Sequence, residues 1–219
     1  MLRRIPIFPL NTVLFPGMLL PLHIFEPRYR EMIKRCLEGD RTFGVCLIAA
    51  GQEVGGEADP FPIGTLCEIR TVESLDDGRM HLVTHGVERF RIRRLIREHA
   101  YLEAEVESVP DDEPVELGTL PDAARAATAR YIRRALEGQS EPSQEFDLPD
   151  DPTALSHLIG YMVPAAPRVR QELLETSVAE RLRRGMELLE EVNAGVPEPG
   201  DGSQIIASPF QPRRPPSPN

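Results

Sequence analysis

Apolar and polar residues alternate at strand spacing through the first half of the chain, and the period becomes helical in the second half. Four apolar runs of strand length are bounded by glycine, proline or acidic residues, at 18–25, 41–50, 63–73 and 79–87. Asp76-Asp77-Gly78 predicts a hairpin turn between the last two runs. Gly51–Pro62 is rich in glycine, proline and acidic residues and predicts an exposed loop. Residues 5–109 are therefore expected to be mostly strand.

The first strand, which ends at Phe25, leads directly into an amphipathic helix. Pro27 falls at the first helical position, where its missing N–H is not needed. The apolar face behind it repeats at helical spacing in Tyr29, Met32, Ile33, Cys36 and Leu37. Gly39 is expected to end this helix in the left-handed conformation.

Opposite charges alternate with apolar residues in the segments 88–94 and 101–107. If these segments pair about a turn near Glu98, the three arginines that alternate with apolar residues in the first face the three glutamates of the second on the solvent side of the sheet. The expected pairs are Arg93 with Glu103, Arg91 with Glu105, and Arg89 with Glu107. Each pair would stabilise the hairpin by roughly 0.2–1 kcal/mol. The pairing would also make the most basic segment of the chain locally neutral.

From Pro121 the apolar spacing predicts helices. Their expected positions are 122–136, a segment capped by Asp151 and Pro152, 168–175, and a last helix that opens with the capping box Ser177–Glu180. A proline-rich tail follows Gly195 and is expected to be disordered. The pattern predicts an α+β protein with a β lobe over 1–117, a helical bundle over 118–195 and a disordered tail over 196–219.

Composition narrows the classes of partner. The longest apolar stretch, Val13–Phe25, is interrupted by Pro16 and Pro21 and contains His23, so it is not expected to span a membrane. No signal-peptide pattern follows the N-terminal arginines, and a cytoplasmic location is expected. The formal net charge of −10 argues against general binding to nucleic acid, because phosphate contacts require a positive surface.

Cysteine and lysine usage limits the possible chemistry. The three cysteines, Cys36, Cys46 and Cys67, form no C-x-x-C pair and are expected to be buried free thiols in a reducing compartment. Only one of the 25 basic residues, Lys34, is a lysine. A mechanism that needs a buried, activated lysine therefore has a single poor candidate.

Several motifs, in this order, resemble the N-terminal domain of Lon proteases. They are FEPRY at residues 25–29, the hairpin DDGRMHLVTHGVERFRI, the strand Y-L-x-A-x-V, and HLIGYMVPAAPRVRQELLETSVAERLRRGMELLEEV at 157–192. The likeness covers about residues 5–195. It implies an N-terminal PUA-like β-barrel lobe followed by a C-terminal helical bundle. It also implies a domain that engages substrates rather than cutting them.

The catalytic parts of Lon proteases have no counterpart in these motifs. The ATPase requires G-x-x-x-x-G-K-[ST], a string that this sequence lacks, and the peptidase requires a serine activated by a lysine, whereas Lys34 has no serine near it. The resemblance therefore implies a non-enzymatic chain without cofactors. His81 and His85 have the spacing of a helical metal pair, but on a strand they would lie roughly 13 Å apart, so no metal site is expected.

Six residues are candidates for substrate binding. Glu26 and Arg28 either make local contacts at the helix start or border a peptide groove between the barrel and the first helix, with Tyr29 at its edge. Phe15, Met18 and Phe61 are either core residues or an apolar binding surface near proline-containing loops.

The leading functional hypothesis is a binding module for unfolded or degron-bearing protein segments, with a separate ATP-dependent protease as a further candidate partner. The alternative is a PUA-like nucleic-acid-binding module, against which the net charge speaks. A small-molecule-binding protein or an unrecognised enzyme is a third class, which no motif supports. The C-terminal PFQPRRPPSPN either docks to a proline-reading partner or has no partner.

Overall fold

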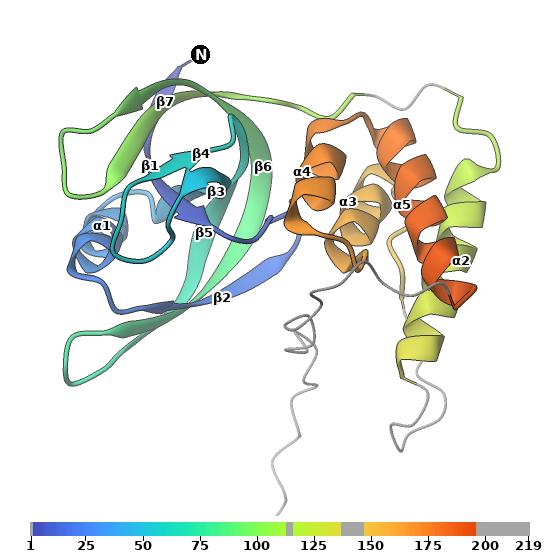
Figure 1. Cartoon of the computed structure of the whole chain (residues 1–219), viewed down its shortest axis with the longest axis horizontal. Coiled ribbons are helices and arrows are strands. Elements are labelled where there is room, and N and C mark those ends of the chain that lie inside the picture. Colours follow the sequence, from blue (N-terminus) through green and yellow to red (C-terminus); the bar gives the residue numbers. More distant parts are fainter. Residues whose placement is uncertain (1, 113–115, 137–146, 196–219) are drawn as a thin grey trace, which may run out of the picture.

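The computed structural model describes residues 2–112, 116–136 and 147–195, and it consists of a β lobe and a helical lobe that lie side by side (Figure 1). The strands are β1 (Arg3–Leu10), β2 (Leu19–Ile24), β3 (Thr42–Gly51), β4 (Ala58–Pro60), β5 (Ile63–Ser74), β6 (Met80–Ile96) and β7 (Leu102–Ser108). The helices are α1 (Pro27–Glu38), α2 (Leu120–Ala135), α3 (Pro152–Met162), α4 (Pro167–Glu175) and α5 (Val178–Asn193). This order confirms the predicted α+β fold class.

The strands of the β lobe close into a ring. β1 pairs with β7 in the antiparallel sense and with β3 in the parallel sense, so that the path β1–β7–β6–β5–β3 returns to its start. β4 is added beside β3, and β2 is added beside β6. Among the described residues β2 pairs with β6 alone, so its second edge has no strand partner.

Helix α1 packs its apolar face against the barrel interior, as its spacing predicted. Tyr29, Met32, Ile33 and Cys36 are buried, and the Tyr29 ring lies 4.2 Å from the Phe8 ring between centroids. Pro27 opens the helix at the predicted position.

Helix α1 ends at Glu38 with Gly39 as its C-cap, as predicted, but the predicted left-handed conformation of Gly39 is wrong. Gly39 has φ −108°, whereas Arg41 adopts the left-handed φ of 61°. The N–H groups of both residues donate to the Cys36 carbonyl, so the chain reverses two residues later than predicted, immediately before β3. The Arg41 guanidinium donates to the carbonyl of Ile69, which holds the turn against β5.

The segment Gly51–Pro62 is not entirely a loop, contrary to the prediction. It contains β4, which pairs with β3, and the Phe61 N–H donates to the Leu47 carbonyl at 2.8 Å. Ala58 is buried and anchors this short strand against the barrel. A three-residue strand is too short for a periodic pattern to reveal it.

The predicted register of the β6–β7 hairpin is wrong. Arg91 lies opposite Glu107, and Arg94 lies opposite Glu105. The register shifts at a bulge between Ile92 and Arg94, where Arg93 is the additional residue. A bulge places two residues opposite one, and the alternating pattern by itself contains no sign of it.

The three glutamates of β7 nevertheless face arginines. Glu105 pairs with Arg94 at 2.7 Å and Glu107 pairs with Arg93, while Glu103 pairs with Arg4 of β1 at 2.5 Å. The side chains of Arg4, Arg93 and Arg94 are exposed, so each pair stabilises the fold only weakly.

Arg89 has an entirely different position from the predicted solvent-facing one. Its side chain is 4% exposed and points to the helical lobe, where its Nη2 lies 2.9 Å from Asp111. Its Nη1 donates to the carbonyl of Leu174 at the end of α4. Arg89 thus links β6 to the helices and contributes nothing to the hairpin surface.

Asp111 is the centre of a buried ionic cluster between the lobes. Besides Arg89, its carboxylate accepts hydrogen bonds from Arg181 of α5 at 3.2 Å and from His157 Nε2 of α3 at 2.8 Å. Arg181 is fully buried and also donates to the carbonyls of Leu173 and Thr176. These carbonyls lie at the C-terminal end of α4, where no helix N–H can reach them.

The cluster sets the charge states of its members. Burial opposes ionisation of Asp111, but the hydrogen bond from His157 and the positive charges of Arg181 and Arg89 outweigh it and lower its pKa to about 2. Burial lowers the pKa of His157, and the neighbouring arginines act in the same direction against the attraction of Asp111. His157 is therefore neutral at pH 7, with its proton on the nitrogen that faces Asp111.

An apolar core lies beside this cluster and belongs to both lobes. It contains Val13, Phe15, Leu47 and Ile63 from the β lobe and Leu155, Ile159, Leu173, Leu174, Val178 and Leu182 from the helices. A Cβ at Gly160 of α3 would lie 2.5 Å from the Phe15 ring, so only glycine permits this contact. The domain boundary between residues 117 and 118 stays a prediction.

The predicted caps at Asp151 and Ser177 are confirmed, whereas the Glu180 carboxylate of the predicted capping box accepts from Arg183. Asp151 accepts a hydrogen bond from the Ala154 N–H at 2.8 Å, and Ser177 accepts one from the Glu180 N–H at 3.2 Å. The predicted tail 196–219 lies outside the described residues.

Replacing Asp111 with asparagine should lower the free energy of unfolding by about 3–5 kcal/mol, because Arg89 and Arg181 would remain buried without a counter-ion. Urea unfolding followed by circular dichroism measures this. Asp150→Asn is the matched control, because Asp150 is exposed and pairs with Arg125 at the surface, so its loss should cost less than about 1 kcal/mol. Equal effects of the two substitutions would contradict the assigned role of Asp111.

Stability should also fall in acid. The folded-state pKa of His157 lies below its ordinary value of 6.5, so the unfolded chain binds the proton more readily. The contribution of neutral His157 to the free energy of unfolding is fully present above pH 6.5 and is lost as the pH falls through the folded-state pKa. Asp111 contributes in the same sense, and its contribution is lost as the pH falls from 3.8 to about 2. His157→Gln should flatten the dependence of the unfolding free energy on pH near pH 6 in urea titrations. An unchanged dependence would refute the assignment to His157.

Candidate functional site

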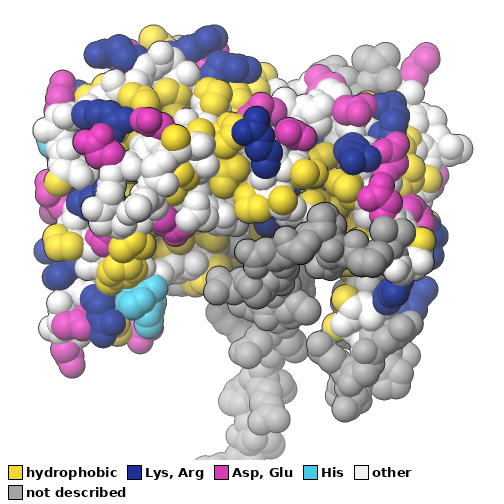
Figure 2. Space-filling model, in the orientation of Figure 1, with side chains coloured by type: hydrophobic (Ala, Val, Ile, Leu, Met, Phe, Trp, Pro, Cys, Tyr) yellow, Lys and Arg dark blue, Asp and Glu magenta, His cyan; other side chains and the backbone are white. Residues whose placement is uncertain are grey.

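Exposed apolar side chains gather along β2. The large apolar residues that are exposed in the described part of the chain are Leu2, Leu19, Phe25, Val54 and Val87. All except Leu2 flank β2: Leu19 begins the strand, Phe25 follows it, and Val87 follows the β6 residues that pair with it. Over the lower side of the barrel lobe, where β2 runs, hydrophobic side chains lie next to histidines (Figure 2).

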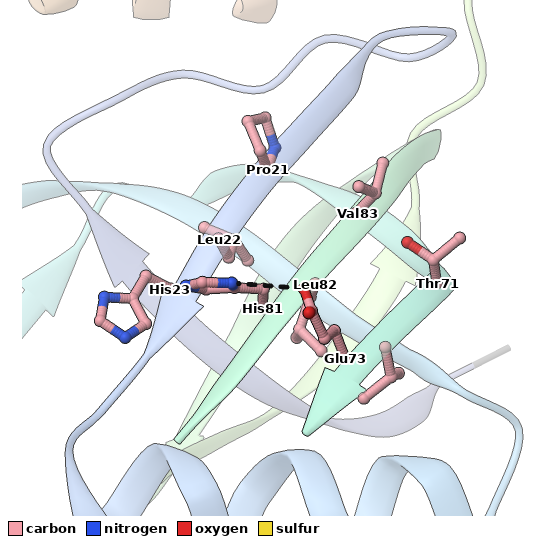
Figure 3. A pocket seen from close by; sticks show the side chains of 9 residues that line it. Pro21, Leu22, His23, Thr71, Glu73, His81, Leu82 and Val83 are labelled. Atoms are coloured by element: carbon pink, nitrogen blue, oxygen red, sulfur yellow. Dashed lines mark ion pairs between the residues drawn. The ribbon is translucent and has the colours of Figure 1, made fainter. Parts of the chain in front are cut away.

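A hollow of about 430 Å³ lies on the outer face of the sheet formed by β2, β6 and β5 (Figure 3). Its lining residues are Pro21, Leu22, His23, Thr71, Val72, Glu73, His81, Leu82 and Val83. Two rows of opposed residues cross the three strands, Pro21–Val83–Thr71 and His23–His81–Glu73. The first row makes the hollow largely apolar, and the second supplies polar groups, with His81 Nδ1 3.6 Å from Glu73.

A second hollow, of about 150 Å³, lies between β2, β1, the start of α1 and the segment 53–54. Its lining residues are Phe8, Leu10, Pro21, Leu22, His23, Ile24, Phe25, Glu26, Tyr29, Glu53 and Val54. The two hollows share Pro21, Leu22 and His23, so β2 separates them. We refer to β2 together with Phe25, Val54 and Val87 as the β2 strip.

Three of the predicted site residues, Glu26, Arg28 and Tyr29, lie at or beside the second hollow. Glu26 is the N-cap residue of α1, but its carboxylate accepts from Arg28 Nε at 3.0 Å and from the Gly55 N–H at 3.3 Å instead of capping the helix. Arg28 also donates to the Gly56 carbonyl at 2.7 Å. Glu26 and Arg28 therefore hold the segment that carries Val54 against the start of α1. This segment forms one wall of the hollow.

Tyr29 is a core residue whose edge reaches this hollow. It is 5% exposed, and the Arg28 guanidinium lies 4.6 Å from the centre of its ring. Burial raises the pKa of its hydroxyl, which stays protonated at neutral pH. This cation–π contact further stabilises the position of the Arg28 side chain beside the hollow.

The other three predicted residues lie at the junction of the lobes. Phe15 is fully buried in the shared core, as the core interpretation of this residue expected. Met18 is half-buried and contacts both the barrel core and the shared core, and Phe61 is half-buried below the Arg168 guanidinium, 5.4 Å from its ring. The six candidates thus form two separate groups, and their role in binding stays a prediction.

Sequence reasoning missed Leu19, Pro21 and His23 as surface residues, and it did not place Val54 of the predicted exposed loop beside β2. The segment LLPLHI is so apolar that its pattern predicts a strand buried on both faces of the sheet. One signal was available, because proline inside a strand is typical of an edge strand. Val54 had no signal of its own, since the tertiary fold alone places it beside β2.

The described residues contain little that could perform chemistry. Among them no group of three or more histidine, cysteine or acidic side chains is arranged to hold a metal ion. All three cysteines are buried, as predicted, and burial raises the pKa of the Cys36 thiol to about 12 and raises those of Cys46 and Cys67 as well. A protonated, buried thiol is a poor nucleophile.

The Asp111–His157 pair resembles half of a catalytic triad, but its surroundings are structural. His157 is 3% exposed, its ring packs 6.2 Å from the Phe15 ring, and its Nδ1 has no hydrogen-bond partner among the described residues. The nearby Ser156 hydroxyl accepts from Arg181 and donates to the Thr153 carbonyl.

In the described part of the chain, no helix is long and apolar enough to cross a membrane.

A family model matches residues 4–191, that of the ATP-dependent protease La (LON) substrate-binding domain. Lon protease 2 of Myxococcus xanthus is 30% identical over 191 residues, which are 84% of this chain and 23% of that protein. Lon protease of Desulfosudis oleivorans is 27% identical over 188 residues, which are 83% of this chain and again 23% of the relative. The chain therefore spans about a quarter of the length of these curated relatives.

Two solved structures are similar over nearly their whole length. The crystal structure of a Lon N-terminal domain protein from Xanthomonas campestris has a TM-score of 0.63 at 27% identity, covering 83% of this chain and 96% of that one. The N-terminal domain of the Lon protease of the Mycobacterium avium complex has a TM-score of 0.66 at 22% identity, covering 86% and 99%. The second likeness concerns the fold alone.

Proposed function

The chain belongs to the family of Lon substrate-binding domains, and from this membership we propose that it binds exposed segments of other proteins without altering them chemically. The partners are unfolded or degron-bearing segments. A separate ATP-dependent protease is the partner to which such clients would be delivered, or with which the chain would compete for them.

The observation that carries the proposal is the β2 strip. Leu19 is 37%, Phe25 46% and Val54 55% exposed, next to two hollows with largely apolar linings. A contiguous exposed apolar surface is typical of a binding site for another macromolecule. Unfolded segments differ from folded proteins in exposing apolar side chains, so a strip of this chemistry selects them without requiring one sequence.

The charges speak against the nucleic-acid alternative. The net charge is −10, and Arg4, Arg93 and Arg94 are paired with glutamates of β7. Arg89 is buried between the lobes and is not available to a phosphate. Arginines that are already paired neutralise phosphates poorly, because each must first give up its carboxylate partner.

Replacing Leu19 and Phe25 together by serine should weaken binding of an unfolded protein by about tenfold or more, because two apolar contacts are lost. The probe is fluorescein-labelled lactalbumin, reduced and carboxymethylated so that it stays unfolded, and the readout is fluorescence anisotropy. Both side chains are exposed, so the unfolding midpoint should change little.

The matched control is Leu2→Ser. Leu2 is 56% exposed, as apolar as Leu19, and lies before β1, away from β2. Its replacement should leave the affinity within about twofold of the wild type, less than the burial of one apolar side chain is worth. If both variants bind as the wild type does, the β2 strip is not the site. If the wild type does not bind the unfolded probe at all, the proposed function is wrong.

A further inference from the structure

We propose that a client segment binds by adding itself as an extended strand to the free edge of β2, with its side chains directed alternately into the two hollows. The inference rests on the proposed function and names the client more closely. The client is a segment that can be extended, offers its own backbone N–H and C=O groups, and carries apolar side chains at successive positions, so that they point to both faces of the sheet.

The backbone of β2 has one set of polar groups directed away from the barrel. The Gly86 N–H donates to the Met18 carbonyl at 2.8 Å, directly before β2 begins opposite His85. In an antiparallel pair, hydrogen-bonded and non-hydrogen-bonded positions alternate. Leu20, Leu22 and Ile24 therefore bond to β6, whereas Leu19, Pro21 and His23 direct their backbone groups to the open edge.

The place of the proline supports this assignment. Pro21 has no N–H and lies at a position where β6 does not require one, opposite Val83. The open edge consequently offers the N–H groups of Leu19 and His23 and the carbonyls of all three outward positions. A single proline also limits uncontrolled pairing between copies, since it removes one donor from the middle of the edge.

The two hollows border β2, so the side chains of an added strand would project next to them. Successive side chains of a strand point to opposite faces of its sheet. Beside β2, one face carries the larger hollow with Pro21 and Val83 (Figure 3), and the other carries the smaller hollow with Phe8 and Tyr29. Backbone pairing would provide affinity for many sequences, and the two hollows would select apolar side chains.

Another unpaired edge of this sheet, on β5, is a poorer acceptor. β3 pairs with β5 only as far as Glu68, so residues 70–74 of β5 also have no second strand partner in the described structure. That segment, RTVES, carries Arg70 and Glu73, and charged side chains discourage strand addition. The segment LLPLHI of β2 carries no Asp, Glu, Lys or Arg. The absence of these charged residues from β2 favours β2 over β5 as the strand to which a client is added.

Amide hydrogen exchange measured by NMR tests the geometry directly. The probe is a peptide as long as β2, with leucine at successive central positions and terminal lysines for solubility. On binding, the amides of Leu19 and His23 should exchange at least about tenfold more slowly, whereas those of Leu20 and Leu22, already bonded to β6, should change little. Protection of residues 70–74 instead, or protection in the concentrated protein without peptide, would overturn the proposal in favour of the β5 edge or of a second copy.

Backbone methylation of the peptide separates strand addition from side-chain docking. Two versions carry N-methyl groups on alternate amides, one on each of the two sets, and their side chains are identical. Only one set can face β2, so one version should lose affinity by about tenfold or more and the other should bind within about threefold of the unmodified peptide. Equal affinities of the two versions would overturn strand addition and leave the proposed function intact. No binding of the unmodified peptide, together with no binding of unfolded lactalbumin, would overturn both.

Pro21→Val adds the missing donor at the open edge. This variant should bind the unmodified peptide between about twofold and tenfold more tightly, the value of one added hydrogen bond. Pro21 is exposed and at a position not bonded to β6, so the fold should tolerate valine. Weaker or unchanged binding by a folded Pro21→Val protein would count against pairing along this edge.

Discussion

Arg89 of the barrel and Arg181 of the last helix share the carboxylate of Asp111 in the junction between the lobes. Both guanidinium groups also donate to carbonyls at the end of α4, and His157 stays neutral, which helps the fold to tolerate two buried cations with one anion. Removing Asp111 would leave both cations buried without a counter-ion. The relative placement of barrel and helices therefore depends on this cluster and on the apolar core beside it.

The junction also determines where β2 runs. Phe15 is locked against Gly160 of α3, and three residues later the Met18 carbonyl bonds to Gly86, which starts β2 along β6. At the other end, Pro27 begins α1, whose buried face fixes the chain inside the barrel. β2 is thus held at both ends, while the ring closes through β1 and β3 without it. An edge strand positioned in this way is rigid, which suits a surface that must recognise backbone geometry.

Local signals predicted the elements well. The start and the buried face of α1, the caps at Asp151 and Ser177, the turn at Gly78 and the burial of the cysteines all follow from residues within a few positions of one another. The failures share a different cause. The bulge at Arg93, the left-handed turn at Arg41 and the burial of Arg89 depend on partners distant in the sequence, which no periodic pattern contains. The same holds for the β2 strip, because an apolar strand looks identical whether its second edge is paired or free.

The amino-acid sequence by itself determined the order of a β lobe and a helical lobe, the helix boundaries set by proline, aspartate and serine, and the family to which the chain belongs. These depend on local backbone preferences and on motifs. The tertiary structure alone decided which charges are buried and which edge stays open. Arg89 and Arg91 look alike along the chain, and only the approach of α4 and Asp111 makes one of them interior. Burial and strand pairing depend on segments that are distant in the sequence and meet only in the folded protein. The sequence of one such segment therefore does not reveal them.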